Sequence, residues 1–265
     1  MKIAIIAIAK NEELYINEWI NYHLNLGFDN IIICDNDDEL ILPSIVTDNR
    51  VIIEDYTGIY GVQQMAYQQS FRKYKEQYDW ILLIDIDEFL VLDKHKDVKE
   101  FLSSFDDNVD CIKLCWKHFT DNEELDVIDG NYNVFDRFKT VIETNRDNFV
   151  KQFIKTSSID DDIIERIHQH DILSHKITTV DSLGNKCHMN RMLNKVVYGN
   201  AWVNHYKTKT IGEFIRQKYF RGGPNRNNAK YGRFEYFFEI NKKTDEKVAY
   251  AEKLIKEIKN SNMTS

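Results

Sequence analysis

Three acidic residues, Asp85, Asp87 and Glu88, follow a run of apolar residues in the sequence WILLIDIDEF. The apolar run at 80–84 is typical of a buried strand, and a buried carboxylate is costly unless it is paired or bound to a metal. Two aspartates separated by one residue can reach the same side of a bend and hold a hard divalent cation through oxygen. Because Mg²⁺ usually takes one or two protein carboxylates and completes its shell with water and phosphate oxygens, the pattern favours a metal–diphosphate site. The alternative is an acidic strand end exposed to water.

The third acid, Glu88, is expected to point in a different direction from Asp87, because successive side chains of a strand point to opposite faces. If the strand continues that far, the Glu88 side chain points away from that of Asp87. We therefore expect Glu88 to support the site structurally rather than to bind the metal directly.

Strand and helix patterns alternate along the first part of the chain. Continuous apolar runs predict strands at 2–9, 30–35, 50–55 and 80–85. Residues at helical spacing predict a helix that is capped by Asn11 and ends at Gly27, and a second helix between 60 and 76. This alternation predicts the α/β class, with an open sheet and right-handed crossovers.

Polar residues stand at the carboxyl ends of three of these predicted strands. Asn11, Asp35 and Asp85 each fall at or just beyond such an end. In open α/β sheets, ligands bind at this edge. Three polar residues at one edge are stronger evidence for a ligand site than any one of them.

The regular alternation ends after about residue 110. The stretches 111–116 and 132–138 have strand-like patterns. Residues 244–260 have the pattern of an amphipathic helix, which we expect to pack on the body of the protein.

The composition excludes several classes of protein. The chain has 265 residues, 43% of them hydrophobic, as in globular proteins. No apolar stretch reaches the roughly 18 residues that a spanning helix needs. The four cysteines lack the CxxC spacing of a zinc site, which favours a reducing, cytoplasmic location. A net charge of −8 argues against a general nucleic-acid binder.

Positive charge is nevertheless concentrated in one segment. Residues 206–243 contain ten Lys and Arg against three Glu. Such a segment suits a phosphorylated ligand or an acidic membrane surface. We expect the basic, aromatic stretch 216–238 to make peripheral contact with the inner membrane face or with a carrier diphosphate, and an ordinary solvated surface is the equal alternative.

Four blocks of the sequence resemble the bacterial family-2-like glycosyltransferases related to family 92. The blocks are AIAKNEELYINEWINYHLNLGFDNIIICDND, QQMAY, WILLIDIDEFLVL and NHYKTKTIGEFIRQKYFRGG, and they span most of residues 3–223 in the family's order. The resemblance implies a GT-A fold, with an open mixed sheet flanked by helices, and a UDP-sugar donor. We accordingly expect a nucleotide-sugar-binding half at 1–110, an acceptor-side and metal-closing half at 111–243, and a C-terminal helix and tail at 244–265.

The resemblance also implies roles for individual residues. Asp87 would ligate Mn²⁺ or Mg²⁺ directly, Asp85 would face the ribose or the metal, and His205 would be the late metal or diphosphate ligand. The other donor contacts that we expect are Ala7, Ala9, Asn11, Glu12, Asp35, Gln64 and Lys151, with Gln63 as an alternative to Gln64.

Fixed cations are expected to stabilise the departing nucleoside diphosphate. Negative charge accumulates on its phosphate oxygens as the glycosidic bond breaks, and cations stabilise that charge. The candidates are Lys207, Lys218 and Arg221 in the basic segment, where an arginine can hold a phosphate through two hydrogen bonds.

An inverting transfer also needs a base for the acceptor hydroxyl. The polar loop after 119 offers Asp121 and Glu123, in a stretch where Thr120 departs from the glycine that is usual in the family. A solvated acidic loop is the alternative. Nearby, Trp116 and Phe119 either stack on an acceptor sugar or pack in the core.

The sequence therefore predicts a metal-dependent, inverting glycosyltransferase. It would transfer a hexose, with galactose as the first choice, from a UDP-sugar to a saccharide acceptor, which we expect to be lipid-linked, in surface-glycan synthesis. A non-catalytic protein that binds nucleotide sugars or glycans is the alternative from another class. A sugar nucleotidyltransferase would need a Gly-rich basic loop after the first strand, and a haloacid-dehalogenase-type phosphatase would need DxDxT there, and the sequence has neither.

Overall fold

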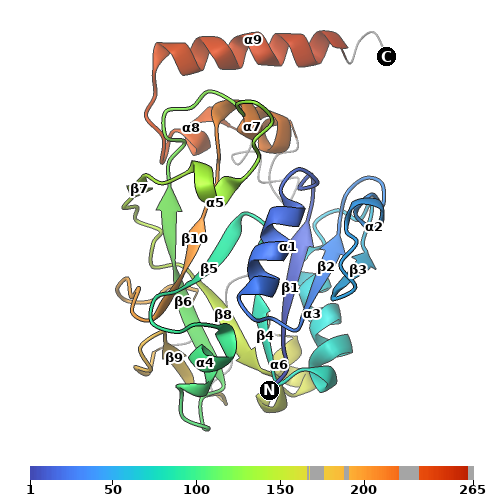
Figure 1. Cartoon of the computed structure of the whole chain (residues 1–265), viewed down its shortest axis with the longest axis vertical. Helices are drawn as coiled ribbons and strands as arrows, with labels where there is room; N and C mark the ends of the chain where they lie inside the picture. The colour runs from blue at the N-terminus through green and yellow to red at the C-terminus, as the bar shows by residue number, and fades with distance from the viewer. Residues whose placement is uncertain (166, 168–175, 188–190, 221–232, 262–265) are drawn as a thin grey trace. The chain divides into compact units, whose positions relative to one another are not determined.

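The computed structural model describes residues 1–165, 167, 176–187, 191–220 and 233–261, and it divides into two compact units (Figure 1). The first unit comprises Met1–Lys117 and Asn145–His205, and the second comprises His118–Thr144 and Tyr206–Ser265. These units do not coincide with the functional parts expected at 1–110, 111–243 and 244–265, and the roles of those parts remain a prediction.

An open mixed sheet is the framework of the first unit. Its strands follow the order β3-β2-β1-β4-β8-β6-β10-β5, and β9 pairs with β6. The parallel strands are β1 (Ile3–Ala9), β2 (Asn30–Asp35), β3 (Val51–Asp55) and β4 (Trp80–Leu83). The others are β5 (Glu88–Leu92), β6 (Cys111–Phe119), β8 (Val150–Lys155), β9 (Thr179–Asp181) and β10 (Ala201–His205). The expected α/β class and open mixed sheet are confirmed.

Helices connect the parallel strands of this unit. α1 (Ile16–Asn25) joins β1 to β2, and α3 (Gln63–Tyr74), extended by a 3-10 turn at Lys75–Gln77, precedes β4. The shorter helices are α2 (Leu42–Ile45), α4 (Val98–Ser103), the 3-10 turn Thr156–Ser158 and α6 (Asp161–Ile164). Within the described ranges, no helix is both long enough and apolar enough to cross a bilayer.

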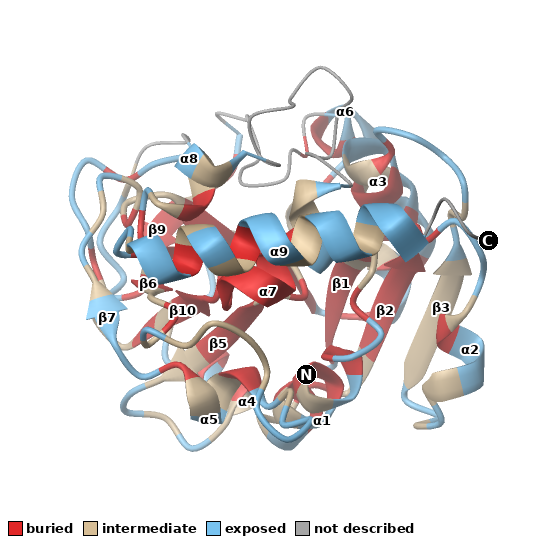
Figure 2. Ribbon diagram, turned by 90° about the horizontal axis from the view of Figure 1, so that it is seen from above, coloured by how far each residue is buried: buried red, intermediate tan, exposed pale blue. Residues whose placement is uncertain are grey.

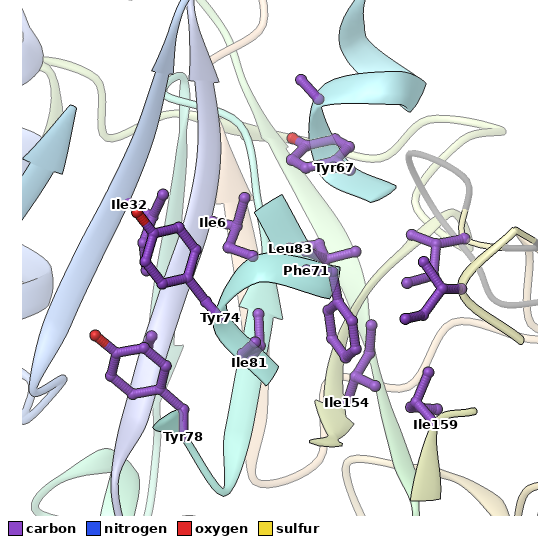
Figure 3. Close-up of a cluster of buried hydrophobic side chains, with 14 of the residues drawn as sticks. Ile6, Ile32, Tyr67, Phe71, Tyr74, Tyr78, Ile81, Leu83, Ile154 and Ile159 are labelled. Carbon is purple, nitrogen blue, oxygen red and sulfur yellow. The ribbon is translucent and has the colours of Figure 1, made fainter. Parts of the chain in front are cut away.

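Alternate side chains of the parallel strands pack against α3 (Figure 3). Ile6, Ile81 and Leu83 lie in one cluster with Phe71 and Tyr74 of the helix. Figure 2 shows β1 and β2 buried along almost their whole length, whereas β3, at the edge of the sheet, is half-buried. Burial on both faces explains why the first two strands read as continuous apolar runs.

The second unit contains short elements and one long helix. They are α5 (Val134–Arg137), β7 (Val141–Ile142), α7 (Ile211–Phe214), a π-helical turn at Ile215–Tyr219, α8 (Phe234–Phe237) and α9 (Asp245–Ser261). The apolar face of α9 packs on a cluster that includes Phe214 and Phe237: Ala251 is buried in it, and Ile255 and Ile258 are half-buried against it. The expected amphipathic helix and its packing are confirmed.

Two local predictions are wrong. The stretch 132–138, expected to be a strand, contains α5, because its buried residues Val134 and Phe138 are four apart and share one side of a helical turn. Asn11 does not cap α1, which begins at Ile16 after the N-cap residue Tyr15. Asn11 instead adopts the left-handed conformation, with a φ of 57°, which asparagine tolerates better than most residues.

Side chains of α1 hold the start of β5. The indole Nε1 of Trp19 donates to the carbonyl of Glu88 at 2.6 Å, and the hydroxyl of Tyr22 donates to the carbonyl of Leu90 at 2.8 Å. The Leu90 N–H donates to Nε2 of His23 at 3.3 Å, and Nδ1 of His23 lies 2.9 Å from the carbonyl of Trp19. Both contacts are satisfied by a neutral ring with its proton on Nδ1. Burial lowers the pKa of His23 to about 3.

This buried imidazole predicts a specific pH dependence of stability. Below about pH 6.5 the unfolded chain binds a proton at His23, whereas the folded chain excludes that proton until about pH 3. The free energy of unfolding should therefore fall on acidification, with His23 contributing about 1.4 kcal/mol per pH unit between roughly pH 6 and 4. Urea unfolding at pH 6, 5 and 4 measures this slope. The variant His23→Gln keeps a donor and an acceptor and should lose this component, and an unchanged slope would contradict the assignment.

Candidate active site

The three acids lie in and just after the turn between β4 and β5. β4 ends at Leu83, and the N–H of Glu88, the first residue of β5, donates to the carbonyl of Asp85 at 3.1 Å. The predicted strand therefore ends before Asp85. The expectation that Glu88 points away from Asp87 is wrong, because it assumed one continuous strand.

Glu88 and His205 are cross-strand neighbours. The antiparallel register of β5 and β10 pairs them directly, and side chains of such pairs lie on the same face of a sheet. Nε2 of His205 lies 3.7 Å from Oδ1 of Asp87 and 3.9 Å from Oε1 of Glu88. One ligand atom from each of these three residues lies within 4.8 Å of the others. The structure thus brings together two expected metal ligands, Asp87 and His205, and adds Glu88.

The side chain of Glu88 fits a role as a metal ligand. It is fully buried, and its Oε1 has no hydrogen-bond partner among the residues that the structure describes. Burial raises the pKa of Glu88 well above its ordinary value, with Asp85 and Asp87 adding to the rise and Lys151 opposing it. An unsatisfied buried acceptor costs about 1–3 kcal/mol. A divalent cation would satisfy it, and two carboxylates with one imidazole are a donor set that such cations accept.

Asp85 takes part in a buried ion-pair network. Nζ of Lys151, on β8, lies 2.6 Å from Oδ2 of Asp85 and 3.3 Å from Oε2 of Glu88. Burial lowers the pKa of Lys151, but the two carboxylates outweigh this effect and raise it above its usual value. Lys151 is therefore a permanent cation beside two of the three acids. Asp85, expected at the ribose or the metal, is oriented by this cation.

The helix α3 orients the other oxygen of Asp85. Oδ1 of Asp85 accepts hydrogen bonds from Nε2 of Gln63 at 3.0 Å and from the hydroxyl of Tyr67 at 2.8 Å. Burial, reinforced by Asp85, raises the pKa of Tyr67 well above its ordinary value, so this phenol remains a donor. Gln64 is exposed, so the contact with Asp85 belongs to the alternative residue, Gln63. Tyr67 was missed, although it ends the block QQMAY.

An aromatic stack lies beside His205. The ring of Trp116, on β6, lies 4.5 Å from the His205 ring between centroids, and it stacks on Phe149 at 5.5 Å. Trp116 is only 7% exposed. Of the two alternatives for Trp116, the structure therefore favours core packing, in which the indole limits the orientation of the His205 ring. In the second unit, the ring of Phe119 packs against Tyr206.

The ends of β1 and β2 form a loop region rich in acids. Asp35 is fully buried, and its carboxylate accepts the N–H groups of Asp37 at 3.1 Å and Leu42 at 3.2 Å, which fixes the loop after β2. Asp37 accepts the N–H of Asn11 at 2.6 Å through Oδ1, while its Oδ2 has no hydrogen-bond partner within the described ranges. Burial raises the pKa of Asp37, and the Asn11 N–H lowers it in part. Asp37, in the acidic run that follows β2, was missed in the sequence.

The remaining residues expected at the donor contribute backbone at this edge. Ala7 is buried within β1, and the carbonyl of Ala9 accepts the N–H of Asn36 at 2.9 Å. The carbonyl of Glu12 accepts two N–H groups in the turn that leads into α1. Their contact with a nucleotide remains a prediction.

The cations expected at the phosphates have protein partners within the second unit. Nζ of Lys207 lies 2.9 Å from the Glu239 carboxylate and 3.7 Å from the centroid of the Tyr236 ring. Nζ of Lys218 donates to the carbonyl of Lys207 at 2.5 Å. Arg221 lies outside the described residues, as does the central part, 221–232, of the stretch 216–238.

The two candidate bases lie in different environments. Asp121 is 1% exposed and forms an ion pair with Lys247 at 2.5 Å, a geometry that opposes its expected role as the base. The side chain of Glu123 is 75% exposed, and its nearest cation, Lys242, lies 3.8 Å away. Of the two, only Glu123 has a carboxylate open to solvent.

Solved structures show low similarity to the chain. A mycobacterial protein is 16% identical (44% of this chain, 41% of that one, TM-score 0.34), and TarS from S. aureus is 12% identical (82% and 38%, TM-score 0.40). Glucosyl-3-phosphoglycerate synthase from Mycobacterium tuberculosis, solved with Mn²⁺, UDP and phosphoglyceric acid, is 13% identical (72% and 71%, TM-score 0.35). The chain thus spans less than half the length of the first two.

Comparison of the sequence with family models identifies the family of the chain, whereas its similarity to the solved structures is low. No curated protein matches the chain. A family model, however, matches residues 6–243, which is most of its length. This match confirms the family resemblance and the class of enzyme expected from the sequence, and the chain belongs to glycosyltransferase family 92.

Proposed function

We propose that this protein is a divalent-cation-dependent glycosyltransferase that transfers a hexose from a UDP-sugar to a saccharide acceptor. The observation that carries the proposal is the grouping of Asp87, Glu88 and His205 at the carboxyl end of the sheet of a family 92 chain. This edge is where open α/β sheets bind their ligands.

The balance of charge at the site supports a divalent cation. Asp85, Asp87 and Glu88 bring three carboxylates close to one permanent cation, Lys151. The three carboxyl groups thus outnumber the single cation, and a divalent cation would supply further positive charge to them. Asp87, Glu88 and His205 would hold the cation, and Mn²⁺ or Mg²⁺ bound there would stabilise the charge that develops on the UDP leaving group.

Residues around the proposed cation site orient its ligands and offer contacts to the donor nucleotide. Lys151 forms ion pairs with Asp85 and Glu88, and Trp116 limits the orientation of the His205 ring. Three groups, Gln63, Tyr67 and Lys151, orient the carboxylate of Asp85, and we assign to it the role of accepting a hydrogen bond from the donor ribose. Asp37 has an unsatisfied buried oxygen at the same edge of the sheet and is a better partner for the uracil or ribose than Asp35, whose oxygens are both used.

An inverting transfer requires that the acceptor hydroxyl lose its proton as the new bond forms. We propose Glu123 as the base, since Asp121 is held in a buried ion pair. Galactose remains the first choice of sugar, and a lipid-linked saccharide the first choice of acceptor, with peripheral membrane contact through 216–238. These assignments rest on the resemblance of the sequence to its family.

Calorimetric titration with UDP tests the metal site directly. The wild type should bind UDP with Mn²⁺ present and bind it at least about tenfold more weakly with EDTA, because the cation links the protein to the diphosphate. Asp87→Asn should abolish the effect of Mn²⁺. Asp93→Asn, which changes an exposed aspartate just after β5, is the matched control and should bind like the wild type. Equal UDP affinity with and without Mn²⁺ would refute the proposed metal role.

Lys151 gives a second prediction, on stability. Lys151→Met would leave the fully buried Glu88 and the half-buried Asp85 without their cation, and breaking a buried pair from one side typically costs about 3–5 kcal/mol. Thermal unfolding should show a markedly lower Tm, and added Mn²⁺ should restore part of the loss because it supplies positive charge to the same acids. Lys155→Met, on the same strand, removes only a hydrogen bond to the carbonyl of Asp107 and should lower the Tm far less. Equal shifts for the two variants would argue against a charged network.

A further inference from the structure

The loop that carries Glu123 has an unusual backbone. Asn122 and Glu123 are consecutive residues in the left-handed region, with φ values of 50° and 65°. This conformation is tolerated by asparagine but disfavoured for glutamate, and it persists only where the surroundings fix it. The fixing contacts come from both sides of the loop.

Asp121 is the anchor on one side. Its Oδ1 accepts the N–H of Glu123 at 3.0 Å, and its carbonyl accepts the N–H of Glu124 at 2.9 Å, so one residue closes the turn through two bonds. The carboxylate is held by Nζ of Lys247, on α9, at 2.5 Å, and both side chains are only 2% exposed. The N–H of Asp121 donates to the side chain of Asn241 at 2.8 Å.

Asn122 is the anchor on the other side. Its Nδ2 donates to the carbonyl of Arg137 at 2.6 Å, and its Oδ1 accepts the N–H of Thr140 at 3.1 Å. Both polar atoms of this side chain are therefore used inside the second unit. The backbone that precedes the Glu123 side chain cannot rotate without breaking these bonds.

The next two acids after Glu123 take part in ion pairs. Glu124 pairs with Arg137 at 3.1 Å, and Asp126 receives two hydrogen bonds from the guanidinium of Arg216 and one from the hydroxyl of Tyr250. Glu123 differs, because its side chain is 75% exposed and Lys242 lies 3.8 Å away with a similarly exposed side chain. Surface pairs of this kind contribute little. Among the acids of the segment 121–126, Glu123 is therefore the one whose side chain is mostly exposed to solvent.

We propose that Lys247 is a positioning residue, which acts through Asp121 to hold the Glu123 carboxylate for the acceptor hydroxyl. This inference rests on the proposed function, in which Glu123 is the base. The C-terminal helix α9 then has a task beyond packing, since it carries the cation that keeps the loop in its left-handed conformation. Pre-positioning of a catalytic group in this way raises the rate without altering the binding of the donor.

A double-mutant cycle separates positioning from a general structural role. The rate measured is the release of UDP from a UDP-sugar, chosen by screening a panel, with Mn²⁺ present. Glu123→Gln should lower this rate by roughly 100-fold or more. Lys247→Met should lower it at least about tenfold with the affinity for UDP unchanged, and it should cause no further loss when Glu123 is already Gln, since both changes remove the same contribution. Lys253→Met, at an exposed site of the same helix, is the control and should behave like the wild type.

Two further measurements distinguish a positioning role of Lys247 from a general effect on folding. Hydrogen exchange at residues 121–124 should accelerate in Lys247→Met while exchange in β1 and β4 stays as in the wild type. If Lys247→Met does not fold, Asn241→Ala, which removes the second contact to Asp121, should show the same non-additivity with Glu123→Gln. Equal losses in the two backgrounds, or no loss at all, would overturn the positioning role while leaving the proposed function intact. A wild type that binds UDP with Mn²⁺ but never releases UDP from any donor would overturn both.

Discussion

The cost of burying negative charge is the constraint on which the rest of this structure depends. Asp85, Asp87 and Glu88 stand at the end of a sheet whose first strands are covered on both faces, and carboxylates in such a place need partners. Lys151 supplies one positive charge, placed between two of the acids. In the part of the chain that the structure describes, Oε1 of Glu88 has no hydrogen-bond partner, and it lies 3.9 Å from Nε2 of His205, where we propose that a cation binds.

The topology of the sheet is what assembles these groups. A turn connects β4 to β5. β8 pairs with β4 and carries Lys151 to the acids, and β10 pairs with β5 and carries His205 to them. The helix α1 fixes the first residue of β5 through Trp19, and α3 fixes Asp85 through Tyr67. Glu88 and His205 thus lie on strands that also belong to the core, and Asp87 lies in the turn between β4 and β5. The candidate metal site therefore depends on contacts that also hold the sheet together.

Much of this could be predicted from the sequence, and the failures have physical reasons. Buried strands read as apolar runs, and a polar residue after such a run marks the edge where ligands bind, so β1, β2, β4 and the placement of Asp85 and Asp87 near this edge could be predicted. His205 was named from the resemblance of the NHY block to the family, and its role as a ligand remains a prediction. Glu88 was misplaced because a turn broke the alternation of the strand. Asp37 and the pair of Asp121 with Lys247 were missed or misjudged because they depend on loop geometry and on contacts between residues distant in sequence. Local patterns do not carry that information.

In the proposed site, Asp87, Glu88 and His205 hold a divalent cation that binds the diphosphate of the donor. The most direct measurement is an anomalous difference map, collected at the manganese edge from crystals grown with Mn²⁺ and UDP. We expect one strong peak bonded to all three side chains and to the phosphate oxygens of UDP. UDP bound at the sheet edge with no such peak, or with a peak that contacts none of the three residues, would contradict it.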